Sequence, residues 1–185
     1  MKRIVLLGLV AMLLMSAGGC IGRAAKEALL SPKGFSVPVP TKPAAAQRNS
    51  YSKVQMENFT NTGITTMPAD MNRLLQTSLD EKITALQPDK PILDPVAKRV
   101  LLVRGRYVYY EEAGGILDQA FGPFEEIIAL VELVDQASGK VAAKGYCIGR
   151  TGTTRLQGAK RKAEGLAKAI IDLIRKSCKT PPPRD

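Results

Sequence analysis

Three strand patterns in the middle of the chain constrain its fold more than any other feature. Branched and aromatic residues are concentrated in residues 99–111, 126–136 and 140–150. A short polar segment that ends in Gly139-Lys140 joins the last two patterns, and this arrangement is typical of a hairpin. An isolated hairpin is marginal in water, so its apolar face must be covered. We therefore expect a sheet with helices packed against it.

Two amphipathic helical patterns are available to cover that sheet. One opens at Pro68, and its apolar residues fall on a single stripe from Met71 to Leu86. The other carries an apolar stripe from Ala159 to Ile174. With a further strand predicted over residues 51–59, the element order is β-α-β-β-β-α. We predict one α+β domain over residues 51–178, with a mixed or antiparallel sheet, two helices packed on one face and a disordered tail over 179–185.

The N-terminus has the pattern of a targeting signal. A basic Met1-Lys2-Arg3 precedes an apolar run over residues 4–15 and then the small residues 16–19, which predicts a signal peptide over residues 1–19. The Cys20 that follows Ala17-Gly18-Gly19 resembles the lipobox of bacterial lipoproteins. That resemblance implies a diacylglycerol on the Cys20 sulfur and an acylated amino terminus, such as a palmitate. The alternative is an ordinary leader in which the cysteine falls there by chance.

The residues after Cys20 bear on location and reach. The resemblance to lipoproteins implies that an Asp next to the lipidated cysteine would retain the protein at the inner membrane. Ile21 stands there instead, which favours the periplasmic face of the outer membrane. Four prolines within residues 20–50 predict a flexible tether, so we expect the folded domain to begin near Tyr51.

The net charge of +10 is uneven, because residues 140–185 hold 12 basic and 3 acidic side chains. Clustered positive charge attracts acidic proteins, anionic headgroups and cell-wall polymers. Nucleic acid is disfavoured by the predicted compartment. The alternative is a basic but merely solvated helix face. The residues predicted to bind a partner are Arg150, Arg155, Lys160, Arg161, Lys162 and Lys168.

Cysteine and histidine usage limits the chemistry. Cys147 and Cys178 remain after lipidation, and in an exported domain they either form a disulfide or stay as a buried and an exposed thiol. The chain has no His and no Cys-x-x-Cys pair, so we expect no metal site. The covalent lipid on Cys20 is the only non-protein group expected.

Paired carboxylates flank a glycine-rich stretch at residues 113–123. Glu111-Glu112 and Glu125-Glu126 would suit a glycosidase if they met across this loop. Solvated strand ends explain them better, and no serine-nucleophile motif is present. We therefore expect a protein that is not an enzyme.

The whole arrangement resembles a known domain type. Leu101-Leu102-Val103-Arg104-Gly105-Arg106-Tyr107-Val108, then Leu130-Val131-Glu132-Leu133-Val134-Asp135 with Ser138-Gly139-Lys140, precede an Ala-rich final helix. This pattern resembles the DUF4410-like domain of small bacterial lipoproteins. These look related in shape to the curli-secretion pore lipoprotein and to activators of penicillin-binding proteins. The Pro-rich segment 87–95 departs from that pattern.

The resemblance and the residues together favour one function. We expect a membrane-anchored, non-catalytic binding or assembly module of the cell envelope, with a protein partner there. An auxiliary lipoprotein of a lipid or solute transporter is the alternative, followed by a cell-wall hydrolase that uses Glu112 or Glu126. The sequence predicts no particular oligomeric state.

Overall fold

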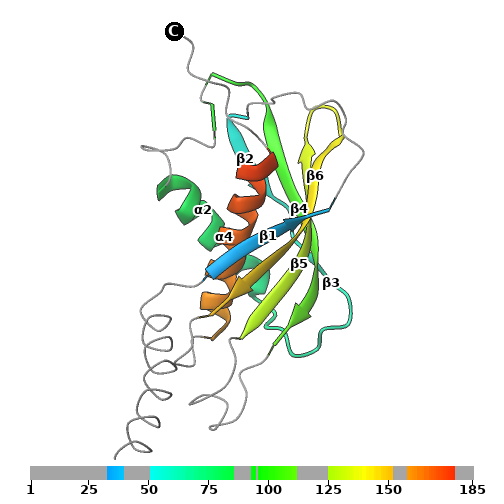
Figure 1. Ribbon diagram of the computed structural model, residues 1–185, viewed down its shortest axis with the longest axis vertical. Coiled ribbons are helices and arrows are strands. Elements are labelled where there is room, and N and C mark those ends of the chain that lie inside the picture. Colours follow the sequence, from blue (N-terminus) through cyan, green and yellow to red (C-terminus); the bar gives the residue numbers. More distant parts are fainter. Residues whose placement is uncertain are drawn as a thin grey trace, which may run out of the picture.

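The computed structural model describes residues 33–39, 51–85, 93–94, 96–111, 125–151 and 158–177. A sheet of six strands carries two helices on one side (Figure 1). The elements are β1 (Lys33–Pro38), β2 (Lys53–Met56), β3 (Thr60–Asn61), α2 (Met71–Ala85), β4 (Val100–Tyr110), β5 (Glu126–Asp135), β6 (Val141–Arg150) and α4 (Gly158–Ser177).

The strand order is β1-β6-β5-β4-β2, with β3 also pairing with β4. The pairs β1–β6, β6–β5 and β5–β4 are antiparallel, whereas β2 and β3 run parallel to β4. The predicted α+β class, with a mixed sheet and two helices, is confirmed. The predicted hairpin joins β5 to β6, and Gly139 there has a φ of 66°, a left-handed conformation that favours glycine.

β1 corrects the prediction of a flexible tether over residues 20–50. Six of those residues form an edge strand that α4 holds in place. The backbone N–H and the hydroxyl of Ser36 donate to the Asp172 carboxylate at 2.9 and 2.7 Å, and the Lys176 ammonium donates to the Ser36 carbonyl at 3.0 Å. These bonds satisfy backbone groups that an edge strand otherwise leaves open. The predicted domain start at Tyr51 is therefore wrong, since Lys33 is already part of the sheet.

The core lies between the sheet and the helices. Gly149 allows α4 to approach closely, because a Cβ at that position would lie 2.3 Å from the backbone nitrogen of Leu166. Neither described helix is long and apolar enough to cross a membrane. The fully buried large side chains include Met71, Leu75 and Leu79 from α2, Leu101, Ile127 and Leu133 from the sheet, and Leu166, Ile170, Leu173 and Ile174 from α4.

The strand predicted over residues 51–59 is shorter than expected. β2 covers Lys53–Met56 alone, and the chain then turns so that Phe59 packs on Tyr107 with ring centroids 5.5 Å apart. The side-chain amide of Asn72 holds this turn, accepting from the Phe59 N–H and donating to the Phe59 carbonyl at 3.0 Å each. The turn fastens the start of α2 to the sheet.

Candidate functional site

The side of the sheet that faces away from the helices carries a continuous set of apolar side chains. Successive residues of a strand point to opposite faces. Gly145 and Gly149 lie against α4. Tyr146 and Ile148 alternate with them along β6, so their side chains point to the opposite face. We call this set the apolar band. Its members are Phe35 and Val37 of β1, Tyr146 and Ile148 of β6, Ile128 and Leu130 of β5, and Val108 and Tyr109 of β4.

The strand register arranges the apolar band in two adjacent rows. The first row runs from Val37 through Tyr146 to Leu130. The second row runs from Phe35 through Ile148 to Ile128. A register shift between Tyr107 and Tyr109 leaves Val108 unpaired, so Val108 and Tyr109 are both exposed. The exposed fractions of the five most accessible members are Val37 49%, Val108 46%, Tyr109 45%, Tyr146 40% and Phe35 36%.

Charged side chains border the apolar band on one side. The Glu132 carboxylate accepts hydrogen bonds from Lys144 at 2.9 Å and from Arg104 at 3.1 Å. The hydrogen bond from Lys144 is the main reason that the pKa of Glu132 lies below its ordinary value. A groove of about 330 Å³ runs along this border between Glu57, Arg106 and these three residues. Among the described residues, Arg106 has no ion-pair partner.

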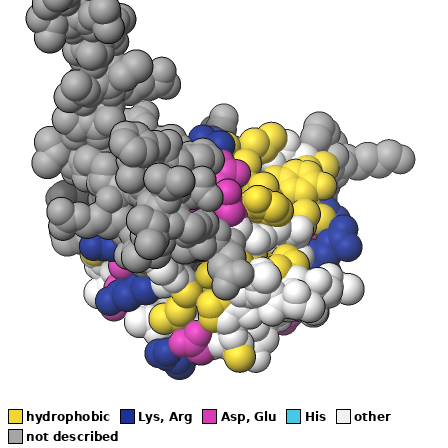
Figure 2. Space-filling view, turned by 90° about the horizontal axis from the view of Figure 1, so that it is seen from below, with side chains coloured by type: hydrophobic (Ala, Val, Ile, Leu, Met, Phe, Trp, Pro, Cys, Tyr) yellow, Lys and Arg dark blue, Asp and Glu magenta, His cyan; other side chains and the backbone are white. Residues whose placement is uncertain are grey.

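A second ion pair closes the other border. Arg150 pairs with Glu126, and its guanidinium also lies 5.2 Å from the centre of the Phe35 ring. The two borders together carry four cations, at positions 104, 106, 144 and 150, against three carboxylates, at positions 57, 126 and 132. Viewed from one end of the molecule, hydrophobic side chains gather at the surface between basic and acidic ones (Figure 2). The apolar band therefore has a polar rim with an excess of positive charge.

The structure does not gather the predicted basic residues into one surface. Arg150 borders the apolar band, whereas Lys168 lies on α4, across the sheet. Arg161 is paired with Glu164 on its own helix at 2.8 Å. Lys160 is exposed on α4, and Arg155 lies outside the described residues.

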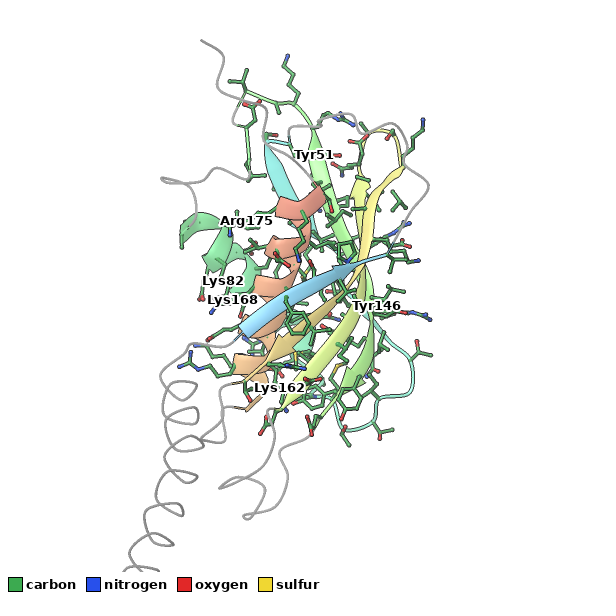
Figure 3. All side chains as sticks on the ribbon, in the orientation of Figure 1. Tyr51, Lys82, Tyr146, Lys162, Lys168 and Arg175 are labelled. Atoms are coloured by element: carbon green, nitrogen blue, oxygen red, sulfur yellow. The ribbon has the colours of Figure 1, made fainter. Side chains whose placement is uncertain are left out.

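Lys162 corrects the prediction of a solvent-facing partner residue. Its side chain is 1% exposed. The ammonium lies 2.8 Å from the Glu125 carboxylate, donates to the Glu111 carbonyl and sits 4.2 Å from the centre of the Tyr110 ring. Glu111 and Glu125 stand at the two ends of the segment 112–124. Lys162 is therefore a buried clamp on those two ends, close to the start of α4 (Figure 3).

The remaining predicted sites have mixed outcomes. Cys147 is a free thiol, and burial raises its pKa well above the ordinary value. Cys178, the other half of the predicted disulfide, lies outside the described residues, as do Cys20 and Glu112. Among the described residues, no group of three or more His, Cys, Asp or Glu side chains could hold a metal ion.

Two parts of the apolar band escaped the sequence analysis. Phe35 and Val37 alternate with small or polar residues, which is a strand signal, but the neighbouring prolines favoured a tether. Tyr109 stands close in sequence to Tyr107 and Tyr110, but the structure places these tyrosines on different faces of the sheet. Tyr107 is buried on the helix side and donates to Asn72 at 2.9 Å, and burial raises its pKa.

Comparison with solved structures finds several with low sequence identity to this chain. No family model matches the chain, and no curated protein matches it. A PelC variant crystallised as a dodecamer from Paraburkholderia phytofirmans is 17% identical, with a TM-score of 0.47 over 80% of this chain and 99% of that chain. The DUF330 protein XCC0632 from Xanthomonas campestris is 11% identical, with a TM-score of 0.38 over 77% and 91%. A provisional lipoprotein from Caulobacter crescentus is 16% identical, with a TM-score of 0.34 over 69% and 92%.

Proposed function

We propose that this chain is a lipid-anchored, non-catalytic binding module of the bacterial envelope, and that the apolar band docks a protein partner. The observation that carries the proposal is the exposure of five large apolar side chains on one face of the sheet. They lie on β1, β6 and β4, and Ile128 and Leu130 of β5 connect the last two strands. Single exposed hydrophobic residues are ordinary, whereas a grouped patch with a polar rim is typical of an interaction surface. Tyrosine and arginine at such a surface supply much of the binding energy.

The partner is recognised by its chemistry. The rim has four cations and three carboxylates, an excess of one positive charge, so the complementary surface is apolar in its centre and acidic at its edge. Electrostatic complementarity of this kind favours encounter and fixes orientation. Arg106 is the cation that a partner carboxylate would engage, because Glu132 already serves Arg104 and Lys144.

The proposed anchor keeps the apolar band near a membrane. Cys20, in its lipobox-like sequence, is the proposed lipidation site, and the outer membrane, facing the periplasm, is the proposed location. Only twelve residues separate Cys20 from Lys33, so the start of β1 lies within about 45 Å of the anchor. A partner would therefore be met at the membrane surface. The DUF4410-like identity of the domain is part of the same proposal.

The proposal is non-catalytic because the three described members of the acidic pairs named from the sequence have structural roles. Glu126 is paired with Arg150 and Glu125 with Lys162. The Glu111 carboxylate accepts from the Glu126 N–H at 3.1 Å. A carboxylate that is held in an ion pair or a backbone hydrogen bond is not positioned to exchange a proton with a substrate.

A site-specific crosslinking experiment tests the docking surface. A photoreactive amino acid replaces Tyr146 in the apolar band or, as the matched control, Lys160 on the exposed side of α4, in the full-length chain within its own envelope. We expect one discrete adduct from position 146 that is lost when Tyr109 is changed to Ser and Arg106 to Glu, and no such adduct from position 160. Equal labelling from both positions would contradict the proposal. An adduct with a second copy of the chain would contradict a separate partner and show instead that the apolar band mediates self-association.

A further inference from the structure

The groove beside β4 opens where the pairing along this strand is interrupted. β2 and β3 both run along β4, with Met56 opposite Val103 and Thr60 opposite Arg106. Three residues that follow Met56 therefore face only two residues of β4. Interruptions of this kind are frequent beside functional sites, because they turn side chains out of the regular alternation. The groove of about 330 Å³ lies at this interruption.

The floor of the groove is fixed from the helix side. Phe59 packs there against Tyr107. A Cβ at Gly105 would lie 2.9 Å from the Phe59 ring and 2.7 Å from the Leu130 carbonyl oxygen, so only glycine fits at this position. The Asn72 amide binds both backbone groups of Phe59 and accepts from the Tyr107 hydroxyl. The groove is therefore preorganised, which lowers the cost of ordering it around a ligand.

Two opposite charges line this groove without a partner. Glu132 accepts from both Lys144 and Arg104, so these three side chains are engaged with one another. Arg106 and Glu57 also line the groove, and both are exposed. Within the described ranges of the chain, neither of these two side chains makes an ion pair or a hydrogen bond. A cation and an anion that border one groove without pairing are complementary to a molecule that carries both charges.

We propose that this groove binds a small zwitterion, an α-amino acid with an apolar side chain. The guanidinium of Arg106 donates two hydrogen bonds to the ligand carboxylate, and the Glu57 carboxylate accepts from the ligand ammonium. Leu130 gives the groove an apolar wall for the ligand side chain, and Asn58 and Thr60 add uncharged polar groups. The volume of about 330 Å³ lies at the small end of ligand sites, which suits a molecule of this size.

The zwitterion site differs from the proposed docking surface in its ligand, although Arg106 belongs to both. A bound zwitterion and a partner carboxylate are therefore alternatives at Arg106. The site needs no protein partner, because its lining belongs to this chain alone. Its test uses the purified chain, whereas the docking proposal is tested within the envelope, so each proposal fails or holds without the other.

Three ligands with the same carbon skeleton test the site on the full-length chain in detergent micelles. Leucine carries both charges, 4-methylpentanoate lacks the amino group, and 3-methylbutylamine lacks the carboxyl group. Ligand-observed NMR titration measures the dissociation constant of each, and empty micelles correct for partition into detergent. We expect leucine to bind several-fold more tightly than either analogue, because leucine alone pairs with both Arg106 and Glu57. Equal dissociation constants for leucine and one analogue, or no binding of leucine, overturn the proposal.

Variants without the charge assign the two contacts. In Glu57→Gln leucine should bind no better than 4-methylpentanoate, and in Arg106→Gln no better than 3-methylbutylamine. The matched controls are Glu81→Gln on α2 and Arg175→Gln on α4, at exposed positions outside the groove, and both should keep the preference for leucine. Survival of the preference in Glu57→Gln or Arg106→Gln overturns the assignment. Circular dichroism checks the fold of each variant, and the comparison of analogues on the unaltered chain does not depend on any of them.

Discussion

The two faces of the sheet are built from the same strands and differ in what covers them. On the helix side, Leu101, Val131 and Leu133 are 0% exposed in the core between the sheet and the helices. On the other side, β1, β4 and β6 present apolar residues of similar size that remain 36–49% exposed. A strand that is apolar on both faces is typical of a sheet covered on both sides. The described residues supply one covering layer, and in the function proposed above a binding partner supplies the second.

The largest expected difference between the faces lies in folding stability. Leu133→Ala leaves a cavity in the covered face, and we expect a loss of about 2–5 kcal/mol in the free energy of unfolding. Tyr146→Ala, on the open face, removes a side chain that is already 40% exposed, and we expect a loss below about 1 kcal/mol. Urea unfolding followed by circular dichroism measures both. Equal losses would mean that the open face is part of the folded core.

Gly34→Val tests how β1 is held at the border of the two faces. A Cβ at Gly34 would lie 2.0 Å from the Gly165 carbonyl oxygen and 2.5 Å from the Ala169 nitrogen. Because backbone cannot yield as a side chain does, we expect β1 to be pushed from α4, at a cost of about 1–3 kcal/mol.

The matched control is Val37→Ala on the open side of the same strand, with an expected cost below about 1 kcal/mol. Hydrogen exchange locates the effect. Loss of protection confined to the β1 amides in Gly34→Val, with β5 unchanged, supports the assignment of β1 as a separately held strand. Full protection of β1 in that variant contradicts it.

Most of the fold could be predicted from the sequence because its signals are local. The alternation in residues 99–111, 126–136 and 140–150 and the stripe from Ala159 to Ile174 are periodic patterns that burial on one side produces. The hairpin at Gly139 follows from turn chemistry. β1 could not be predicted in this way, since its hold on the sheet depends on Asp172 and Lys176, which stand far away in the chain.

The candidate site was harder to predict than the fold. Charge composition suggested a basic surface, but composition does not reveal pairing. Lys162 is the clearest case, because its burial depends on carboxylate and carbonyl groups at two distant positions, Glu125 and Glu111. The apolar band could not be predicted because apolar residues in strands are expected to lie in the core. The sequence does not show that α4 packs on one face of the sheet and leaves the apolar residues of the other face exposed.

Lys162→Met tests the buried clamp. The substitution keeps the apolar stem but leaves Glu125 without its cation and the Glu111 carbonyl without a donor. We expect a loss of about 1–2 kcal/mol, because the freed carboxylate can turn towards water. Lys160→Met, two residues away and exposed, should change stability by less than about 0.5 kcal/mol. Equal changes in the free energy of unfolding of the two variants would contradict the role of Lys162 as a buried clamp.

The smallest expected effect is a pH dependence of the contact between β1 and α4. Burial alone would raise the pKa of Asp172, but hydrogen bonds from Lys176 and Ser36 outweigh it and hold that pKa below its ordinary value. A carboxyl whose pKa is lowered by folding stabilises the fold above its unfolded pKa, near 4, and this contribution is lost as pH falls through the folded pKa. We therefore expect the hydrogen-exchange protection of the β1 amides to fall as the pH drops below about 4.

Asp172→Asn separates this contact from the rest of the sheet. It removes the titrating group, so protection of β1 should be lower at neutral pH and should change less on acidification. Glu132 and Asp135, whose pKa values are lowered mainly by hydrogen bonds from Lys144 and Arg99, still titrate in that variant and act on β4, β5 and β6. Protection of β5 should therefore keep its own acid dependence while that of β1 becomes flatter. An unchanged acid response of β1 in Asp172→Asn would assign the hold on this strand to packing against α4 rather than to the carboxylate.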